Sequence, residues 1–284
     1  MPKCFIFIFD KGRHVYLHSI QRERIKSQDG RSINIIYDDA QMAIIDKIFS
    51  NSQPFITYFN VYNGVKPFEK GKGIPPQTSE IMKSKPYVCE GAKPDNSWTP
   101  LLRGSLIQKY KVTWSENYWI QYGRWLAAPR QPEIFEYPNK IVIRQTGDAI
   151  IATIIDNKFI CRNNLHICIP RNGKIELMYI LGLLNSKLMD FIYTYINPEK
   201  GEVLAEVKKN HVESLPIIYD NIRKPILLDL VNHILTERVK DSNTTELENR
   251  IDNIVFHIYG LTYDEVLIVD PQTPITREEY EKHE

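Results

Sequence analysis

Residues 138–156, PNKIVIRQTGDAIIATIID, decide the fold class of this chain. Two runs rich in isoleucine, Lys140–Arg144 and Ala149–Ile155, stand on either side of Gly147. β-Branched residues favour extended strands, and a glycine between two such runs favours a turn that sends the chain back. A third run, Leu165–Ile169, follows soon after. The middle of the chain is therefore predicted to contain short, mostly antiparallel strands.

The chain before this region combines turns with little regular structure. Residues 64–100 contain ten glycines and prolines, which predicts loops and short strands. Further upstream, residues 4–9 (CFIFIF) and 14–18 are predicted to pair as a hairpin through the turn Asp10-Lys11-Gly12. Asp29-Gly30 indicates a second turn before the run at residues 33–37.

Apolar residues recur at helical spacing in four further segments. These are residues 39–49, 176–196, 225–239 and 246–259. Asp38 or Asp39 is a suitable N-cap for the helix predicted at residues 39–49. Asn197-Pro198 should end the helix at residues 176–196, and Gly260 the helix at residues 246–259. Thr262 is expected to cap a short turn, and the polar tail beyond it to be frayed. The fold class predicted is α+β: an irregular, mostly antiparallel β region with C-terminal helices packed on it.

Composition supports a division into three parts. The chain has 284 residues, of which 43% are hydrophobic and 25% charged, as in proteins that bury a core. Residues 1–60 form an N-terminal hairpin and helix, with 8 Lys+Arg against 6 Asp+Glu. Residues 61–220 carry 21 against 16, and the helical segment 221–284 carries 7 against 13. A basic middle indicates a polyanion partner, although an even scatter of charge around a neutral protein would give the same totals.

Targeting and redox signals are absent from the sequence. No apolar run approaches the ~20 residues that cross a bilayer, and no signal peptide precedes the first strand. The four cysteines form no CxxC pair and no cluster with histidine, so neither disulfides nor structural zinc are expected. A reducing cytoplasm is the expected location.

Catalytic motifs are also missing. The Asn-Pro-Pro-Tyr/Phe motif of amino-methyltransferases does not occur, and the Pro-Pro at residues 75–76 lacks its neighbours. The sequence holds neither G-x-S-x-G nor H-E-x-x-H. Glu206-Val207-Lys208 is an E-x-K tripeptide like that of some nucleases, but such a site needs a second acid on an adjoining strand. Asp190 lies inside a predicted helix, so no catalytic or metal-binding residue is assigned.

Five segments in order resemble one family, the TaqI-like C-terminal specificity domain of adenine-specific DNA methyltransferases and fused type II restriction–modification enzymes. They are residues 100–110 (PLLRGSLIQKY), 138–156, 179–186 (YILGLLNS), 206–217 (EVKKNHVESLPI) and 251–265 (IDNIVFHIYGLTYDE). The likeness extends over residues 61–265, and it explains the E-x-K without a nuclease. Leu106 stands where the family has an acid. Residues 1–60 resemble the end of a methyltransferase domain.

This resemblance implies double-stranded DNA as the partner. For the full enzyme it implies S-adenosylmethionine as methyl donor and N6 of adenine as target. Because this chain lacks the motifs for the donor and the flipped base, the chemistry is expected in another methyltransferase or nuclease domain or subunit. Residues 61–220 are then the target recognition domain.

Candidate DNA-binding residues combine cations with amides and aromatic rings, which contact phosphates and base edges. They are Lys66, Lys70, Lys72, Arg103, Lys109, Lys111, Tyr122, Arg124, Arg130, Arg144, Gln145, Thr146, Arg162, Asn163 and Asn164. Gln121 and Gln131 could pair with adenine edges. Trp114, Trp119 and Trp125 are more often core residues than contacts, and Arg144 could instead pair with Asp148 or Asp156.

Two other functions remain open from the residues alone. The chain could be an active methyltransferase or nuclease whose site is not recognised. It could also be a protein-interaction module in phage defence, with the acidic helical tail docking a partner.

Overall fold

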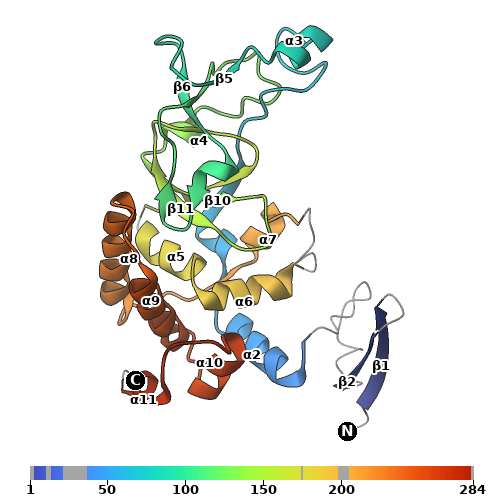
Figure 1. Cartoon of the computed structure of the whole chain (residues 1–284), viewed down its shortest axis with the longest axis vertical. Helices are drawn as coiled ribbons and strands as arrows, with labels where there is room; N and C mark the ends of the chain where they lie inside the picture. The colour runs from blue at the N-terminus through green and yellow to red at the C-terminus, as the bar shows by residue number, and fades with distance from the viewer. Residues whose placement is uncertain (1–2, 11–13, 22–36, 174, 198–204, 283–284) are drawn as a thin grey trace.

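The computed structural model describes residues 3–10, 14–21, 37–173, 175–197 and 205–282. Beyond residue 37, most strands lie at one end of the body and most of the longer helices at the other, with a four-stranded sheet between them (Figure 1). The predicted α+β class, with mostly antiparallel strands and helices packed on them, is confirmed.

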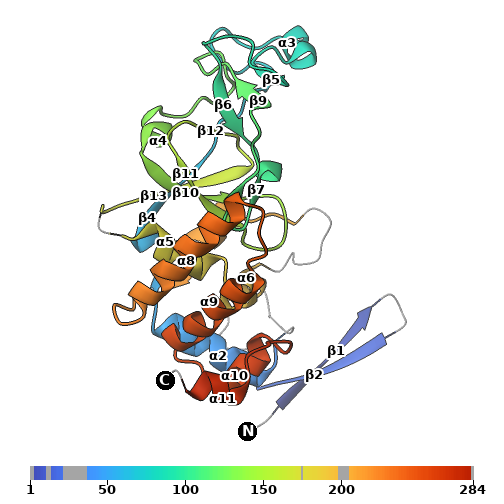
Figure 2. The ribbon, with the colours of Figure 1, turned by 60° about the vertical axis from the view of Figure 1, so that its left-hand side comes forward.

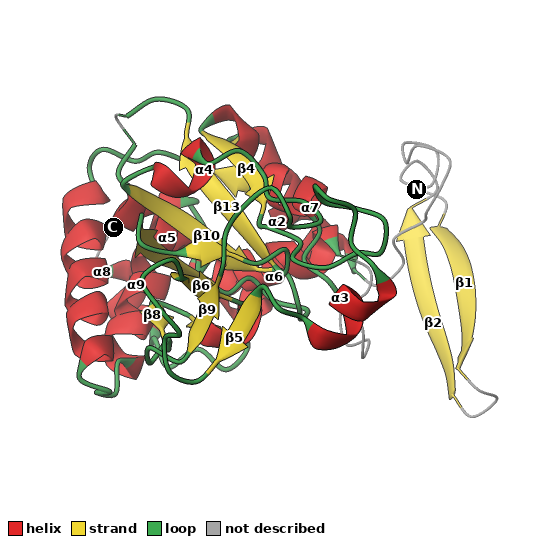
Figure 3. Ribbon diagram, turned by 90° about the horizontal axis from the view of Figure 1, so that it is seen from above, coloured by secondary structure: helices red, strands yellow, loops and turns green. Residues whose placement is uncertain are grey.

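The central sheet has the strand order β11–β10–β13–β4 and is antiparallel throughout. Its strands are β4 (Phe59–Asn63), β10 (Asn139–Arg144), β11 (Ala152–Asp156) and β13 (Leu165–Pro170). The three isoleucine-rich runs therefore form the strands that were predicted for them. Figure 3 shows β10, β13 and β4 side by side from above.

A second sheet, β12–β6–β9–β5, extends the β region away from the helices (Figure 2). It consists of β5 (Val88–Glu90), β6 (Thr99–Leu102), β9 (Tyr118–Ile120) and β12 (Ile160–Cys161). Smaller elements complete the described part of the chain. They are the separate pairs β7–β8 (Ile107–Gln108, Lys111–Val112) and β3–β14 (Gln53–Pro54, Pro216–Ile217), and the short helices η1 (Phe55–Thr57), α3 (Ser79–Ser84), η2 (Gly104–Leu106) and α4 (Glu133–Glu136).

The helical part combines α2, from early in the chain, with the helices that follow the central sheet (Figure 1). These are α2 (Asp39–Ser50), α5 (Leu177–Leu184), α6 (Lys187–Ile196), α7 (Lys209–Glu213), α8 (Lys224–Val239), α9 (Thr245–Ile258), α10 (Tyr263–Val269) and α11 (Arg277–Glu281). The helices predicted near residues 39–49, 225–239 and 246–259 are confirmed. Among the helices of the described residues, none is long and apolar enough to cross a membrane.

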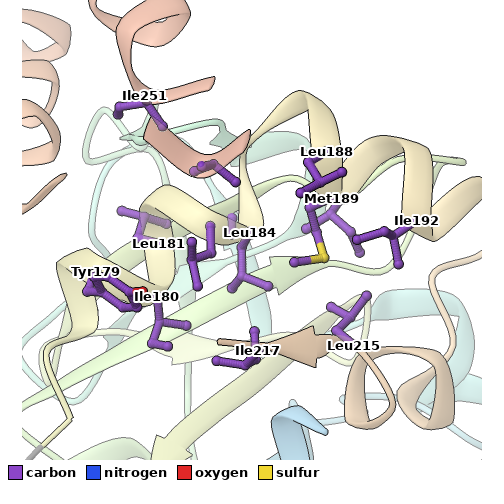
Figure 4. Packing of buried hydrophobic residues seen from close by; sticks show 14 of the residues in the cluster. Tyr179, Ile180, Leu181, Leu184, Leu188, Met189, Ile192, Leu215, Ile217 and Ile251 are labelled. Carbon is purple, nitrogen blue, oxygen red and sulfur yellow. The ribbon is translucent and has the colours of Figure 1, made fainter. Parts of the chain in front are cut away.

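Strand β10 separates two hydrophobic cores because successive side chains point to opposite faces of a sheet. Ile141 and Ile143 belong to the larger core under the helices, which Figure 4 shows around Tyr179 and Leu184. Val142, between them, belongs to the core of the second sheet. Both faces of β10 are covered, which explains why its sequence is apolar without alternation.

One cation is part of this interior. Lys140 on β10 is 0% exposed, and its Nζ donates to the carbonyl oxygens of Phe135, Tyr137 and Asp156 at 2.8, 3.0 and 3.1 Å. Burial lowers the pKa of this ammonium. Three carbonyl acceptors replace the water that a buried charge loses.

The prediction of one helix over residues 176–196 is wrong. The helix ends at Leu184 and α6 begins at Lys187. The side chain of Asn185 accepts from Ala152 N and donates to Ala152 O, both at 3.0 Å, which ties this point to β11. Ser186 then caps α6 by accepting from Met189 N. A side chain that can bond a neighbouring strand interrupts the helix, and apolar spacing does not reveal such a bond.

The expectation of a frayed tail after Thr262 is also wrong. Thr262 caps helix α10 rather than a short turn, and Thr276 caps α11. Tyr280 on α11 is 1% exposed and donates to Leu261 O at 2.6 Å. A single buried tyrosine fixes a segment whose other residues are polar.

The N-terminal expectations are largely confirmed. β1 (Lys3–Asp10) and β2 (His14–Gln21) pair antiparallel, with Asp10 opposite His14. Asp38 is the N-cap of α2 and forms a capping box with Gln41. The run at residues 33–37 lies outside the described residues except for Tyr37, which is buried.

Candidate DNA interface

Candidate residues converge at the edge of the central sheet where β10 ends and β13 begins. Gln145 N donates to Asn164 O at 3.0 Å, which joins the turn after β10 to the turn before β13. Gly104 N donates to Asn164 Oδ1 at 3.1 Å, so the loop after β6 closes on the same point. A Cβ at Gly104 would lie 3.1 Å from Arg144 Cγ, which shows how closely Arg144 passes this loop.

Arg103 and Arg162 lie beside each other because β6 and β12 pair in parallel. In this pair Leu102 is opposite Cys161, so the next residue on each strand is an arginine. Arg162 N donates to Leu102 O at 2.8 Å and extends the pairing by one bond. Arg103, Arg144 and Arg162, which are far apart in the sequence, thus meet at one edge; we call them the arginine cluster.

Tyr118 on β9 contacts two members of this cluster. The Arg103 guanidinium lies over the Tyr118 ring at 4.5 Å from its centroid. Arg162 Nη1 donates to Tyr118 Oη at 2.9 Å. Arg103 Nη1 also pairs with Glu90 Oε1 on β5 at 2.8 Å. The contacts with Tyr118 and Glu90 restrict the orientation of both guanidinium groups.

The turn that carries Arg144 is held in place from both sides. Arg144 Nε donates to Thr146 O at 2.7 Å, and Asp156 pairs with Lys158 Nζ at 3.6 Å rather than with Arg144. Gly147 has φ +118, a conformation that favours glycine, and its N donates to Ala205 O at 3.1 Å.

An acid, Glu206, lies against this turn. Thr146 and Glu206 form an isolated antiparallel bridge, and Gln145 Nε2 approaches Glu206 Oε2 at 3.4 Å. The neighbouring Val207 O is 2.6 Å from Nε2 of the buried His166, whose pKa is lowered mainly by burial. The E-x-K tripeptide therefore supports the turn after β10.

The loop after β4 borders the same edge. Asn163 N donates to Val65 O at 2.8 Å, and Lys66 pairs with Glu69 at 2.7 Å. Arg130 Nε donates to Gly64 O at 3.0 Å, which brings Arg130 next to the loop. Gly64 has no room for a Cβ, which would lie 2.2 Å from Cys161 O. Asn163, Asn164, Lys66 and Arg130 therefore adjoin the arginine cluster.

Two candidate lysines are turned toward the helices instead. Lys109 Nζ contacts Asp190 Oδ2 and Asn185 O, both at 2.9 Å. Lys111 pairs with Asp241, at the loop between α8 and α9. These two residues join the β7–β8 pair to the helical part.

The remaining candidates lie further along the irregular loops. Lys70, Lys72 and Arg124 are exposed. Buried Gln77 organises their loop by donating to Pro67 O and Trp125 O, each at 2.8 Å. Tyr122 Oη donates to Arg130 O at 3.2 Å.

The three tryptophans of this region pack against neighbouring elements. Their Nε1 groups donate to backbone carbonyls: Trp114 to Tyr118, Trp119 to Gly91 and Trp125 to Gln121. These bonds and the burial of Trp119 fit the interpretation of these rings as core residues.

Sequence reasoning missed Glu90 as a neighbour of the cluster and did not single out Tyr118. Both contacts depend on the pairing of β5 and β6 with β9, which no local motif signals. In the described part of the chain, no group of three or more His, Cys, Asp and Glu residues is placed to hold a metal ion.

The comparisons with known proteins concern the part of the chain that carries this edge. Residues 99–217 match the TaqI-like C-terminal specificity domain. The matched residues 99–217 include Arg103, Arg144 and Arg162, and the resemblance drawn from the sequence is confirmed.

Two larger proteins resemble the chain over a greater length. A Methanocaldococcus jannaschii protein, named as a type II restriction enzyme and methyltransferase, is 23% identical over 227 residues, or 76% of this chain and 18% of that protein. The type IIL restriction-modification enzyme MmeI, solved in complex with DNA, superposes with a TM-score of 0.54 at 12% identity, over 99% of this chain and 41% of that one. The chain thus spans under half the length of either protein, and the MmeI likeness concerns the fold.

Proposed function

We propose that this chain recognises a specific sequence in double-stranded DNA as the specificity part of a restriction–modification system. Adenine-N6 methylation and cleavage, with S-adenosylmethionine as methyl donor, belong to another domain or subunit in this proposal. The cell compartment that suits it is the cytoplasm, where the DNA is. The target recognition domain corresponds to residues 61–220, between an N-terminal segment and a helical C-terminal one.

The observation that carries the proposal is the arginine cluster inside the matched specificity domain. Arg103, Arg144 and Arg162 meet at one sheet edge, with amides from Gln145, Asn163 and Asn164 beside them. Cations that bond phosphates fix the register of a protein on DNA, and neighbouring amides can read base edges. This edge is where the proposal places the duplex.

Binding to a pool of randomised duplexes tests the proposal. Repeated selection on the purified chain should enrich one short sequence, and Arg144→Ala should weaken binding to it. Affinity should fall by roughly 0.9 log units per log unit of salt for each phosphate neutralised. A pool that stays random after selection would contradict sequence-specific recognition.

The division of labour needs a separate assay. The chain is incubated with labelled S-adenosylmethionine, duplex DNA and magnesium. We expect neither methyl transfer nor cleavage; either activity from the isolated chain would overturn the assignment of the chemistry to another domain or subunit.

A further inference from the structure

We propose that Arg103 and Arg162 together form a site for one phosphate of the DNA backbone, that Tyr118 positions both, and that Glu90 occupies Arg103 when DNA is absent. The inference rests on the proposed function and names the ligand for one part of its surface. Neither Tyr118 nor Glu90 belongs to the candidate residues predicted from the sequence.

Backbone pairing sets the spacing of the two arginines. The parallel register of β6 with β12 ends at Leu102 and Cys161, so Arg103 and Arg162 directly follow the last residue pair on two adjacent strands. The Arg162 N to Leu102 O bond and the Gly104 N to Asn164 Oδ1 bond hold the chain on either side of them. The two side chains are therefore presented from a rigid edge rather than from a long loop.

Tyr118 constrains both guanidinium groups through different parts of its side chain. Its ring lies under Arg103, and its hydroxyl oxygen accepts from Arg162 Nη1. Tyr118 itself is 3% exposed, so its ring and hydroxyl are fixed by the second core. A buried tyrosine that touches two cations orders them before a ligand arrives, which reduces the entropy lost on binding.

The charges at this point are not balanced. Two guanidinium groups lie beside one carboxylate, Glu90, and no ion pair of Arg162 occurs among the described residues. Arg103 Nε is buried and has no hydrogen-bond partner within the described ranges. An additional anion would offset the repulsion between the arginines, and a phosphate carries several acceptor oxygens for their N–H groups.

A backbone phosphate suits this pair better than a base edge. A guanine edge accepts both bonds from one guanidinium, and the second arginine would then stay without an anion. A phosphate can accept from both groups at once. Glu90 occupies Arg103 with the same kind of oxygen, but its side chain is 67% exposed and is easily displaced into water.

Removal of the Tyr118 hydroxyl tests the positioning role. Tyr118→Phe keeps the ring under Arg103 and loses the bond to Arg162, so duplex affinity should fall about threefold to tenfold. The matched control is Tyr263→Phe, which loses a hydroxyl bond to Ile275 O in the helical part and should bind like the unmodified chain. Anisotropy titrations with a fluorescent mixed-sequence duplex measure both, and circular dichroism verifies that each variant is folded.

Removal of the Glu90 charge tests the competition. Glu90→Gln should tighten duplex binding about threefold or more at low salt, because the phosphate no longer displaces a carboxylate. Glu237→Gln, which removes an ion pair between α8 and Lys240 just beyond that helix, should have no effect. In an Arg103→Ala background, Glu90→Gln should lose its advantage, whereas a general charge effect would persist.

The outcomes separate the two proposals. If the unmodified chain binds no duplex at low salt, the proposed function and this site both fail. If it binds, but Tyr118→Phe binds equally well or the Glu90→Gln gain survives the loss of Arg103, the phosphate site alone is wrong. A weaker Tyr118→Phe and a Glu90→Gln gain that depends on Arg103 establish it.

Discussion

Cations of the β region serve two different ends, and Lys109 and Arg103 illustrate the difference. The two residues stand six positions apart in one segment of the chain. Lys109 turns to the helical part and pairs with Asp190, while Arg103 turns to the sheet edge and joins Arg162. Positive charge in a recognition segment is thus divided between attachment to the helices and the surface proposed for DNA. Lys140 is the extreme case, because it is wholly internal.

The internal cation should give the largest effect. Lys140→Ala would leave three carbonyl oxygens, one buried and two partly buried, without their donor, at about 3–5 kcal/mol of unfolding free energy. Urea unfolding followed by tryptophan fluorescence measures the loss. Lys158→Ala, at an exposed lysine whose ion pair with Asp156 is 3.6 Å long, serves as the control and should change stability little. If the two variants had the same free energy of unfolding, the buried hydrogen bonds of Lys140 would not stabilise the fold as predicted.

Substitution of Arg162, at the sheet edge, should weaken DNA binding rather than reduce stability. Arg162→Ala is expected to weaken duplex binding by about 1.5–3 kcal/mol, and to lower the slope of log affinity against log salt by about 0.9. Thermal unfolding should change much less than duplex binding, because Arg162 forms no ion pair among the described residues and gives up one hydrogen bond, to Tyr118 Oη. A strongly reduced melting temperature with an unaltered salt slope would assign Arg162 to the structure instead.

Substitution of Lys109, which contacts the helical part, should instead reduce stability without changing DNA binding. Lys109→Ala breaks a half-buried ion pair and a bond to Asn185 O, so it should destabilise the chain by about 1–2 kcal/mol. The salt slope of duplex binding should stay as in the unmodified chain. If the slope falls instead, Lys109 contacts phosphate and the division of the cations is wrong.

The smallest predicted effect is the pH dependence of stability caused by Asp252, which lies near Lys109. Burial raises the pKa of Asp252 to about 7, although its carboxylate accepts from Lys187 N at 2.8 Å. A folded pKa above the usual value of 3.8 means that the folded state binds the extra proton, so this group destabilises the fold as pH rises through that range. The unmodified chain should lose about 1 kcal/mol relative to Asp252→Asn between about pH 6 and pH 8. Parallel stability curves for the two proteins would show that Asp252 titrates normally.

The local sequence was sufficient to predict those helices and strands whose ends are determined by residues within or next to the element. Strands β10, β11 and β13 of the central sheet, the Asp38 cap of α2 and the helix ended by Gly260 all follow from runs, caps and turns that lie close together in the chain. The resemblance of five ordered segments likewise needed no coordinates. Those predictions succeeded because β-branched density, capping geometry and glycine conformations act within a few residues.

What the sequence by itself determined is the fold class, the N-terminal hairpin, three strands of the central sheet, most of the longer helices and the kind of partner to expect. Only the tertiary structure decided the break at Asn185, the burial of Tyr280 and which cations share a surface. Each of these depends on a partner far along the chain: Ala152 for Asn185, Leu261 for Tyr280, and strand β12 for Arg103. A periodic pattern shows which side of an element is buried, but not which other element covers it, so side chains that act together across strands become visible only in the fold.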